Sequence, residues 1–149
     1  MTWNKGFKII NMIFPLIGLG VVIFDKLCDS SCSYLKGTFA GLDLKYVGIL
    51  FMALLLLLYL MSASRCAAAV NHLRTMMLSG ALGGEILLIR FQIVHETYCP
   101  FCLAFGVCVF VIFVVNFMRM NRYLALASFL AGIGAFWLFF EGSVLPFYS

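Results

Sequence analysis

Two cysteines with a proline between them, Cys99 and Cys102, open one of the long apolar stretches of the sequence. Pro100 suits the first position of a helix, where a missing N–H leaves no hydrogen bond unmade. Cys99 would then lie near the N-cap, where unpaired amides and the helix dipole favour a thiolate. The spacing puts Cys102 on the same helix face, one turn further along. The pattern predicts a redox-active pair whose two thiols lie at different depths.

Two other interpretations of these cysteines stay open. The pair is compatible with an inert buried couple or a fixed structural disulfide. Zinc is the second alternative, because a zinc site needs four close ligands. The residues that would supply them are Cys28, Cys32, Cys99, Cys102 and His95. We expect no metal. The alternative to a redox enzyme is a non-enzymatic membrane protein that binds a metal or a partner through these thiols.

Cys28 and Cys32 form a second pair, in the polar segment 25–33. A solvated pair on a flexible segment can exchange disulfides by thiolate attack, first with one partner and then with another. A static disulfide that staples the segment is the alternative. The presence of a second pair at Cys99 and Cys102 favours exchange.

The composition predicts that membrane-spanning helices position these pairs. Of the 149 residues, 64% are hydrophobic and 11% are charged, and the mean hydropathy is +1.10, which is too apolar for a soluble domain. A net charge of +4, dispersed along the chain, does not favour nucleic-acid binding. Helices satisfy all backbone groups within one segment in lipid. The expected spans are about 7–24, 46–63, 73–94, 99–118 and 123–140.

Basic residues mark every second connection. They are Lys5, Lys8, Arg65, Arg74, Arg119 and Arg122. Cytoplasmic segments carry the excess of Lys and Arg, so we expect a cytoplasmic N-terminus and an outer C-terminus. The outer loop 25–45 and the start of the fourth span then bring both cysteine pairs to one face. The first span lacks a cleavage site and is expected to be retained, and we expect one domain over 1–149.

Three ionisable residues near the membrane have two interpretations each. Glu85 lies inside the third span, where it is either functional or protonated and hydrogen-bonded. Arg90 either extends to the interface or holds a ligand carbonyl. His95, with Glu96 beside it, either accepts protons from the nearby thiols or simply lies at the interface.

Small and isolated residues are expected to serve packing. The segment 80–84, Gly-Ala-Leu-Gly-Gly, has the small-residue spacing that lets membrane helices approach closely. Cys66 and Cys108 fall on the wrong side or at the wrong depth to join the two pairs, and we expect them to behave as ordinary small residues.

The chain resembles the vitamin K epoxide reductase family, including its bacterial disulfide-forming members. The resemblance covers most of the chain and rests on three features: Cys32 followed by Ser33, the glycine-containing segment 41–48 before the second span, and the segment 98–102 that opens the fourth. It implies a four-helix transmembrane bundle around a quinone, covered by the first outer loop, with a fifth transmembrane helix added.

The resemblance also implies a role for each cysteine. Cys102 would face the quinone and Cys99 would be its partner. Cys32 would attack the Cys99–Cys102 disulfide, and Cys28 would resolve the product. Electrons would run from a secreted thioredoxin-like protein through these pairs to the quinone. This is the chemistry of a membrane thiol–disulfide oxidoreductase that supports disulfide formation.

Further details narrow this expectation. Gly106 stands where vertebrate members carry a tyrosine associated with vitamin K, which favours ubiquinone or menaquinone. The aromatic residues Tyr98, Phe101 and Phe105 would line the quinone ring, and Arg90 would hold a carbonyl. Because the sequence ends soon after the fifth span, we expect the thioredoxin-like partner to be a separate protein. The expected location is the bacterial inner membrane, with the active cysteines on the periplasmic side.

Overall fold

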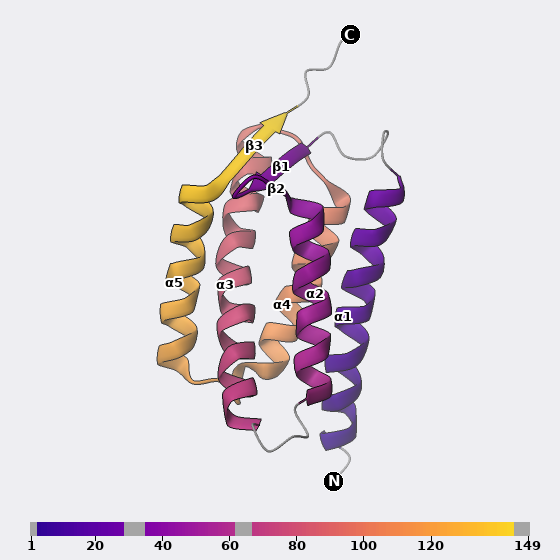
Figure 1. Cartoon of the computed structure of the whole chain (residues 1–149), viewed down its shortest axis with the longest axis vertical. Helices are drawn as coiled ribbons and strands as arrows, with labels where there is room; N and C mark the ends of the chain where they lie inside the picture. Colours follow the sequence, from indigo (N-terminus) through magenta and orange to yellow (C-terminus); the bar gives the residue numbers. More distant parts are fainter. Residues whose placement is uncertain (1–2, 29–34, 62–66, 145–149) are drawn as a thin grey trace.

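Five long helices make up most of the chain in the computed structural model, which describes residues 3–28, 35–61 and 67–144 (Figure 1). Each helix is long and apolar enough to cross a membrane. The elements in order are α1 Trp3–Leu27, β1 Leu35–Phe39, β2 Leu42–Asp43, α2 Leu44–Met61, α3 Ala67–Val94, α4 Pro100–Phe117, α5 Arg122–Phe139 and β3 Phe140–Val144.

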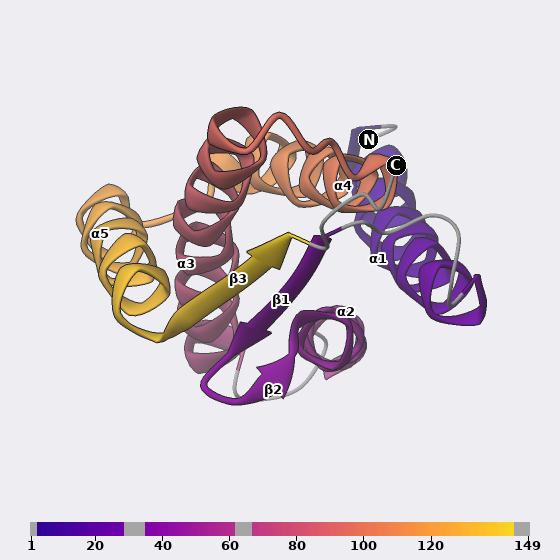
Figure 2. The same cartoon turned by 90° about the horizontal axis from the view of Figure 1, so that it is seen from above.

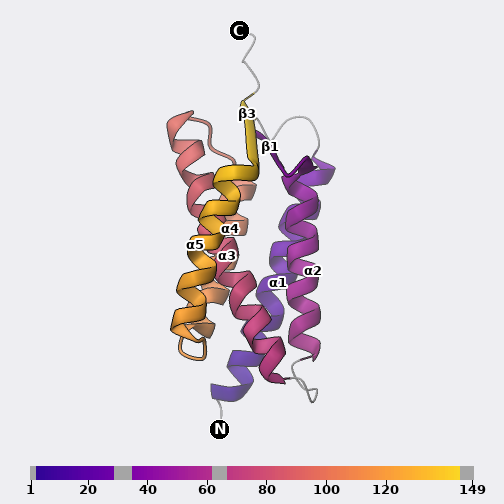
Figure 3. The ribbon, with the colours of Figure 1, turned by 60° about the vertical axis from the view of Figure 1, so that its left-hand side comes forward.

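Four of the helices form a closed bundle and the fifth lies outside it. Helix α1 packs against α2 and α4, and α3 completes the ring through contacts with α4 and α2. Helix α5 packs along the outer side of α3, in the most extensive helix pair of the described chain (Figure 3). The predicted fold class, an all-α membrane protein with a four-helix bundle and a fifth spanning helix, is confirmed.

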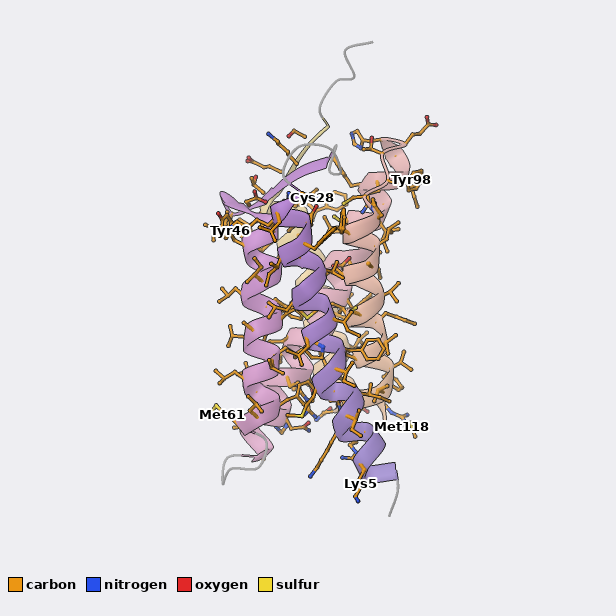
Figure 4. The ribbon with its side chains drawn as sticks, turned by 90° about the vertical axis from the view of Figure 1, so that its right-hand side faces the viewer. Lys5, Cys28, Tyr46, Met61, Tyr98 and Met118 are labelled. Carbon is orange, nitrogen blue, oxygen red and sulfur yellow. The ribbon has the colours of Figure 1, made fainter. Side chains whose placement is uncertain are left out.

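The basic residues before α1 and in the connection after α4 lie at the opposite end of the bundle from Cys28 and Cys99. Lys5 lies at one end, and Cys28 and Tyr98 lie at the other (Figure 4). The Arg119 guanidinium lies 4.2 Å from the centre of the Phe7 ring, which joins the connection after α4 to the start of α1. The charge pattern therefore predicted correctly which connections share an end of the bundle. Which end faces the cytoplasm stays a prediction.

The third helix is longer than the sequence suggested. It begins at Ala67 rather than at residue 73. Its first turns carry polar side chains that look like a connection in the sequence but are partnered in the structure. Arg74 donates to Asn71 Oδ1 at 2.7 Å, and its guanidinium lies 4.7 Å from the centre of the Tyr59 ring. Polar residues can continue a spanning helix when neighbouring helices supply partners.

A small antiparallel sheet, which the sequence did not indicate, crosses one end of the bundle (Figure 2). Strand β1 is central and pairs with β2 and with β3. The β1–β2 hairpin turns through Ala40 and Gly41, which have φ of 52° and 81°, as a two-residue hairpin of the favoured hand requires. Part of the expected outer loop 25–45 is thus strand. We call this end of the molecule the sheet end.

Glycines bring α3 and α5 into close contact. A Cβ added at Gly132 of α5 would collide with the backbone of Gly80 of α3, and one added at Gly83 would collide with the Phe129 carbonyl. Backbone atoms cannot move aside as a flexible side chain can. The prediction that the small residues of segment 80–84 serve helix packing is confirmed.

A polar cluster joins three helices in the half of the bundle away from the sheet. The Tyr59 hydroxyl of α2 donates to Asn11 Oδ1 of α1 at 2.7 Å. The Asn116 amide of α4 donates to the same oxygen at 2.7 Å and to the Tyr59 hydroxyl at 2.9 Å. Hydrogen bonds of this kind between spanning helices each contribute about 0.6 kcal/mol, up to about 1.7 kcal/mol. We name these three residues the polar node.

Candidate functional site

A cavity of about 850 Å³ lies beneath the sheet. Residues of all five helices and of β1 line it, so the sheet covers part of one end of the cavity. Helices α2 and α3, which both line it, pack less extensively than the other neighbouring pairs of the bundle. Its walls are mainly apolar and include Val22, Phe51, Leu88, Phe101, Phe105 and Phe136. This volume is in the range of small-molecule sites.

Both cysteines of the predicted redox pair line this cavity. Pro100 is the first residue of α4 and Cys99 is its N-cap, as the sequence predicted. The Cys102 N–H donates to Cys99 Sγ at 3.4 Å. Both cysteines are free thiols, and Cys99 is only 2% exposed. The helix start therefore holds two adjacent thiols at the edge of an apolar cavity.

Hydrogen bonds favour the thiolate form of Cys99. The bond from the Cys102 side chain has the largest effect, and it lowers the pKa of Cys99 to about 6 with help from the backbone N–H groups of Cys102 and Phe101. Burial and the charge of Asp25 act in the opposite direction and raise this pKa. The hydrogen bonds prevail, so at neutral pH Cys99 is a thiolate and a nucleophile.

The backbone at Cys99 is held by Gln92, a residue that the sequence did not single out. The Cys99 N–H donates to Gln92 Oε1 at 3.0 Å, and the Thr97 N–H donates to the Gln92 carbonyl at 3.0 Å. In the connection between Gln92 and Cys99, Glu96 adopts a φ of 50°. Gln92 is 1% exposed. In the sequence, the only indication of this role is a polar residue near the end of an apolar helix. Its partner is a backbone N–H, which no sequence pattern identifies.

An ion pair lies at the rim of the cavity. Lys45 Nζ of α2 lies 3.5 Å from Asp25 Oδ2 of α1, and both residues line the cavity. Asp25 is 6% exposed, and its buried Oδ1 has no hydrogen-bond partner among the described residues. Buried charges are normally paired, and this pair links α1 to α2.

The predicted quinone contacts divide into two groups. Phe101 and Phe105 line the cavity. Tyr98 does not line it and is 61% exposed, because it precedes the helix in the connection before Cys99. Arg90 is exposed and lines a smaller pocket between α3 and α5. The structure does not bring Tyr98 or Arg90 to the cavity.

The remaining candidates also differ in position. The exposed His95 ring bonds to the Phe91 carbonyl of its own helix at 2.9 Å. Cys108 is buried in the core among apolar side chains. Cys28 follows α1, and its N–H donates to the Phe24 carbonyl at 3.0 Å. Cys32 and Cys66 lie outside the described residues.

No group of three or more metal-ligating side chains gathers anywhere in the described residues, a set that does not include Cys32. Comparison with protein-family models, with curated proteins and with solved structures finds no match. The chemistry of the site therefore has to be inferred from its own geometry.

The low pKa of Cys99 gives a first testable result. In the reduced protein the ultraviolet absorbance of the thiolate should appear with a midpoint near pH 6, well below the value of about 8.5 for an ordinary cysteine. Cys102→Ala removes the strongest hydrogen bond and should move the midpoint upward. Asp25→Asn removes an opposing charge and should move it downward. A midpoint that does not respond to Cys102→Ala would contradict this account.

Proposed function

We propose that the chain is a membrane thiol–disulfide oxidoreductase that oxidises a thioredoxin-like partner and reduces a membrane quinone. One observation carries this proposal: a free Cys99–Cys102 pair at a helix start lines a large apolar cavity enclosed by spanning helices. A dithiol at this position meets water-borne thiols on one side and lipid-borne molecules on the other. The resemblance to the vitamin K epoxide reductase family supports the same activity.

The proposed relay is a series of thiol–disulfide exchanges. The partner's dithiol reduces a Cys28–Cys32 disulfide and becomes a disulfide itself. Cys32 then attacks Cys99 Sγ of a Cys99–Cys102 disulfide, which releases the Cys102 thiolate. Cys28 displaces Cys99 from the mixed disulfide, so that the first pair is oxidised again and the second is reduced. Each exchange passes two electrons, and the low pKa of Cys99 supports its role as the thiolate released in the last step.

The cavity fits a quinone. Its volume would hold a substituted ring and part of an attached chain, and apolar and aromatic side chains make up most of its walls. Phe101 and Phe105 would contact the ring, with Cys102 as the nearest reactive group. A quinone accepts two electrons and two protons when the two thiols close to a disulfide. We propose ubiquinone or menaquinone as the acceptor, since both dissolve in the membrane.

The sheet end would face the outer compartment, which is the periplasm if the chain is a bacterial inner-membrane protein. Disulfides form and persist on that side of the membrane. The segment with Cys28 and Cys32 follows α1 and precedes β1, and α1 ends at the same end of the bundle as the cavity. A separate thioredoxin-like protein would dock there.

A coupled assay tests the proposal. Purified protein in detergent, supplied with a reduced thioredoxin-like protein and a short-chain quinone, should convert one quinone to quinol for each partner disulfide formed. The same preparation is analysed for bound metal. Stoichiometric zinc, together with thiols that react only after chelation and no quinol, would instead establish the non-enzymatic binding protein and overturn the proposal.

A further inference from the structure

We propose that the buried carboxyl of Glu85 is the proton-transferring group of the cavity: it gives a proton to the bound quinone and recovers one from the Cys102 thiol. This inference rests on the proposed function and adds a catalytic residue to it. Sequence analysis left open whether Glu85 is functional or only a packed, protonated side chain, and its position in the structure favours the first interpretation.

The carboxyl lies against α4 at Gly106, one helical turn from the reactive thiol. A Cβ built at Gly106 would lie 2.9 Å from Glu85 Oε2, so the carboxyl of α3 occupies the space that a side chain at this position of α4 would fill. Gly106 follows Cys102 by one helical turn on the same face, which is a rise of about 6 Å. Glu85 and Cys102 both line the cavity. Because residue 106 is a glycine, the Glu85 carboxyl has room to lie against α4 on the side of Cys102 that is further from the sheet.

Glu85 is buried without a charge partner. Its side chain is 7% exposed, and no hydrogen bond or ion pair joins it to another residue in the part of the chain that the structure describes. An isolated carboxylate in an apolar setting costs several kcal/mol, so the group is held as the neutral acid. The neutral Glu85 carboxyl can therefore donate a proton to a molecule bound in the cavity.

Among the described residues, no other titratable side chain that lines the cavity has the same position. Asp25 and Lys45 form the ion pair at the rim. Lys36 and Asp43 belong to the strands of the sheet end, and Cys99 is the N-cap above Cys102. Glu85 is nine residues from the end of α3, or about 14 Å along the helix. Glu85 is therefore the acid that could reach a quinone ring in contact with Cys102 from the side further from the sheet.

The proton balance closes with solvent water as the one further reactant. When the Cys99 thiolate and the Cys102 thiol close to a disulfide, they lose two electrons and one proton, and the quinol takes its second proton from water. Glu85 donates its proton to one quinone oxygen and is neutralised again by the proton of the Cys102 thiol. The carboxyl ends in its starting state, so it serves in every turnover.

Two substitutions and three measurements test this role. Glu85→Gln keeps the shape and hydrogen-bonding capacity but cannot transfer a proton, whereas Glu85→Asp keeps the acid on a shorter side chain. Stopped-flow mixing of pre-reduced protein with a short-chain quinone measures dithiol oxidation. Equilibrium titration measures quinone affinity. Infrared spectroscopy of the quinone-free protein, reduced and oxidised, records the carboxylic acid C=O band.

We expect Glu85→Gln to slow oxidation by about 100-fold, as for loss of a general acid, with quinone affinity unchanged. Glu85→Asp should retain more of the rate than Glu85→Gln, whereas a purely structural role predicts the reverse. The C=O band should be absent from Glu85→Gln and should shift in wild type when the adjacent thiols are oxidised.

Several outcomes would overturn the inference: a wild-type rate in Glu85→Gln, a Glu85→Gln rate above that of Glu85→Asp, a loss of quinone affinity equal to the loss of rate, or no C=O band from Glu85. These results differ from failure of the proposed function. In that case the wild-type dithiol itself would not be oxidised by quinone.

Discussion

Cys102→Ser abolishes quinone reduction, with an expected loss on the order of 1,000-fold or more, because Cys99 and Cys102 can then no longer close to a disulfide. Serine keeps a hydroxyl that can donate to Cys99 Sγ, so the hydrogen bond that stabilises the thiolate has a replacement. The substitution therefore removes the redox step while leaving the helix start in place. Quinol formation in the coupled assay measures the loss.

The same variant should accumulate a trapped species. With Cys102 absent, oxidation can join Cys99 only to the cysteines of the outer segment, and Cys32 is the proposed partner. Peptide mapping under non-reducing conditions should find a Cys32–Cys99 cross-link. Cys108→Ala is the matched control, since Cys108 lies on the same helix but is buried in the core, and it should retain turnover. Undiminished turnover in Cys102→Ser would contradict the relay.

Gly132→Ala is expected to have the largest effect on stability. The added methyl group would collide with the carbonyl oxygen, Cα and C of Gly80, all backbone atoms of α3. The two helices must separate to admit it, and overpacking of this kind costs about 1–3 kcal/mol or more. Thermal denaturation in detergent should show a lowered midpoint. Cavity shape should change too, since both glycines line it.

Gly134→Ala provides the control on the same helix. An added Cβ there meets nothing within 4 Å, and alanine has the higher helix propensity. Its midpoint should equal or exceed that of the wild type. Equal midpoints for the two variants would mean that α3 and α5 do not pack as closely as the glycines indicate.

The sequence predicted the helices well because long apolar stretches in lipid have few other structures open to them. It predicted the placement of Cys99 and Cys102 at a helix start because cap, proline and spacing are all local features. Most predicted helix ends differ from the observed ones by a few residues. The start of α3 was wrong because Arg74 and Asn71 are partnered inside the bundle rather than exposed in a connection.

Features that depend on distant partners escaped prediction. Strand β3 pairs with β1 across more than 100 residues (Phe39 with Phe140, for example), and no local pattern links the two. Gln92 acts through a backbone N–H of the next helix. Phe101 and Phe105 reached the cavity and Arg90 did not, because the rotation of each helix about its axis decides which face meets the cavity.

The polar node has a geometric consequence for the site. It joins α1, α2 and α4 in the half of the bundle away from the sheet, whereas the cavity lies in the other half. Asn116 of the node and Cys102 are joined by a continuous helix of about 21 Å. If α4 tilted by about 5° about the node, the Cys102 thiol would move through about 2 Å. A displacement of that size is comparable to the length of a disulfide bond.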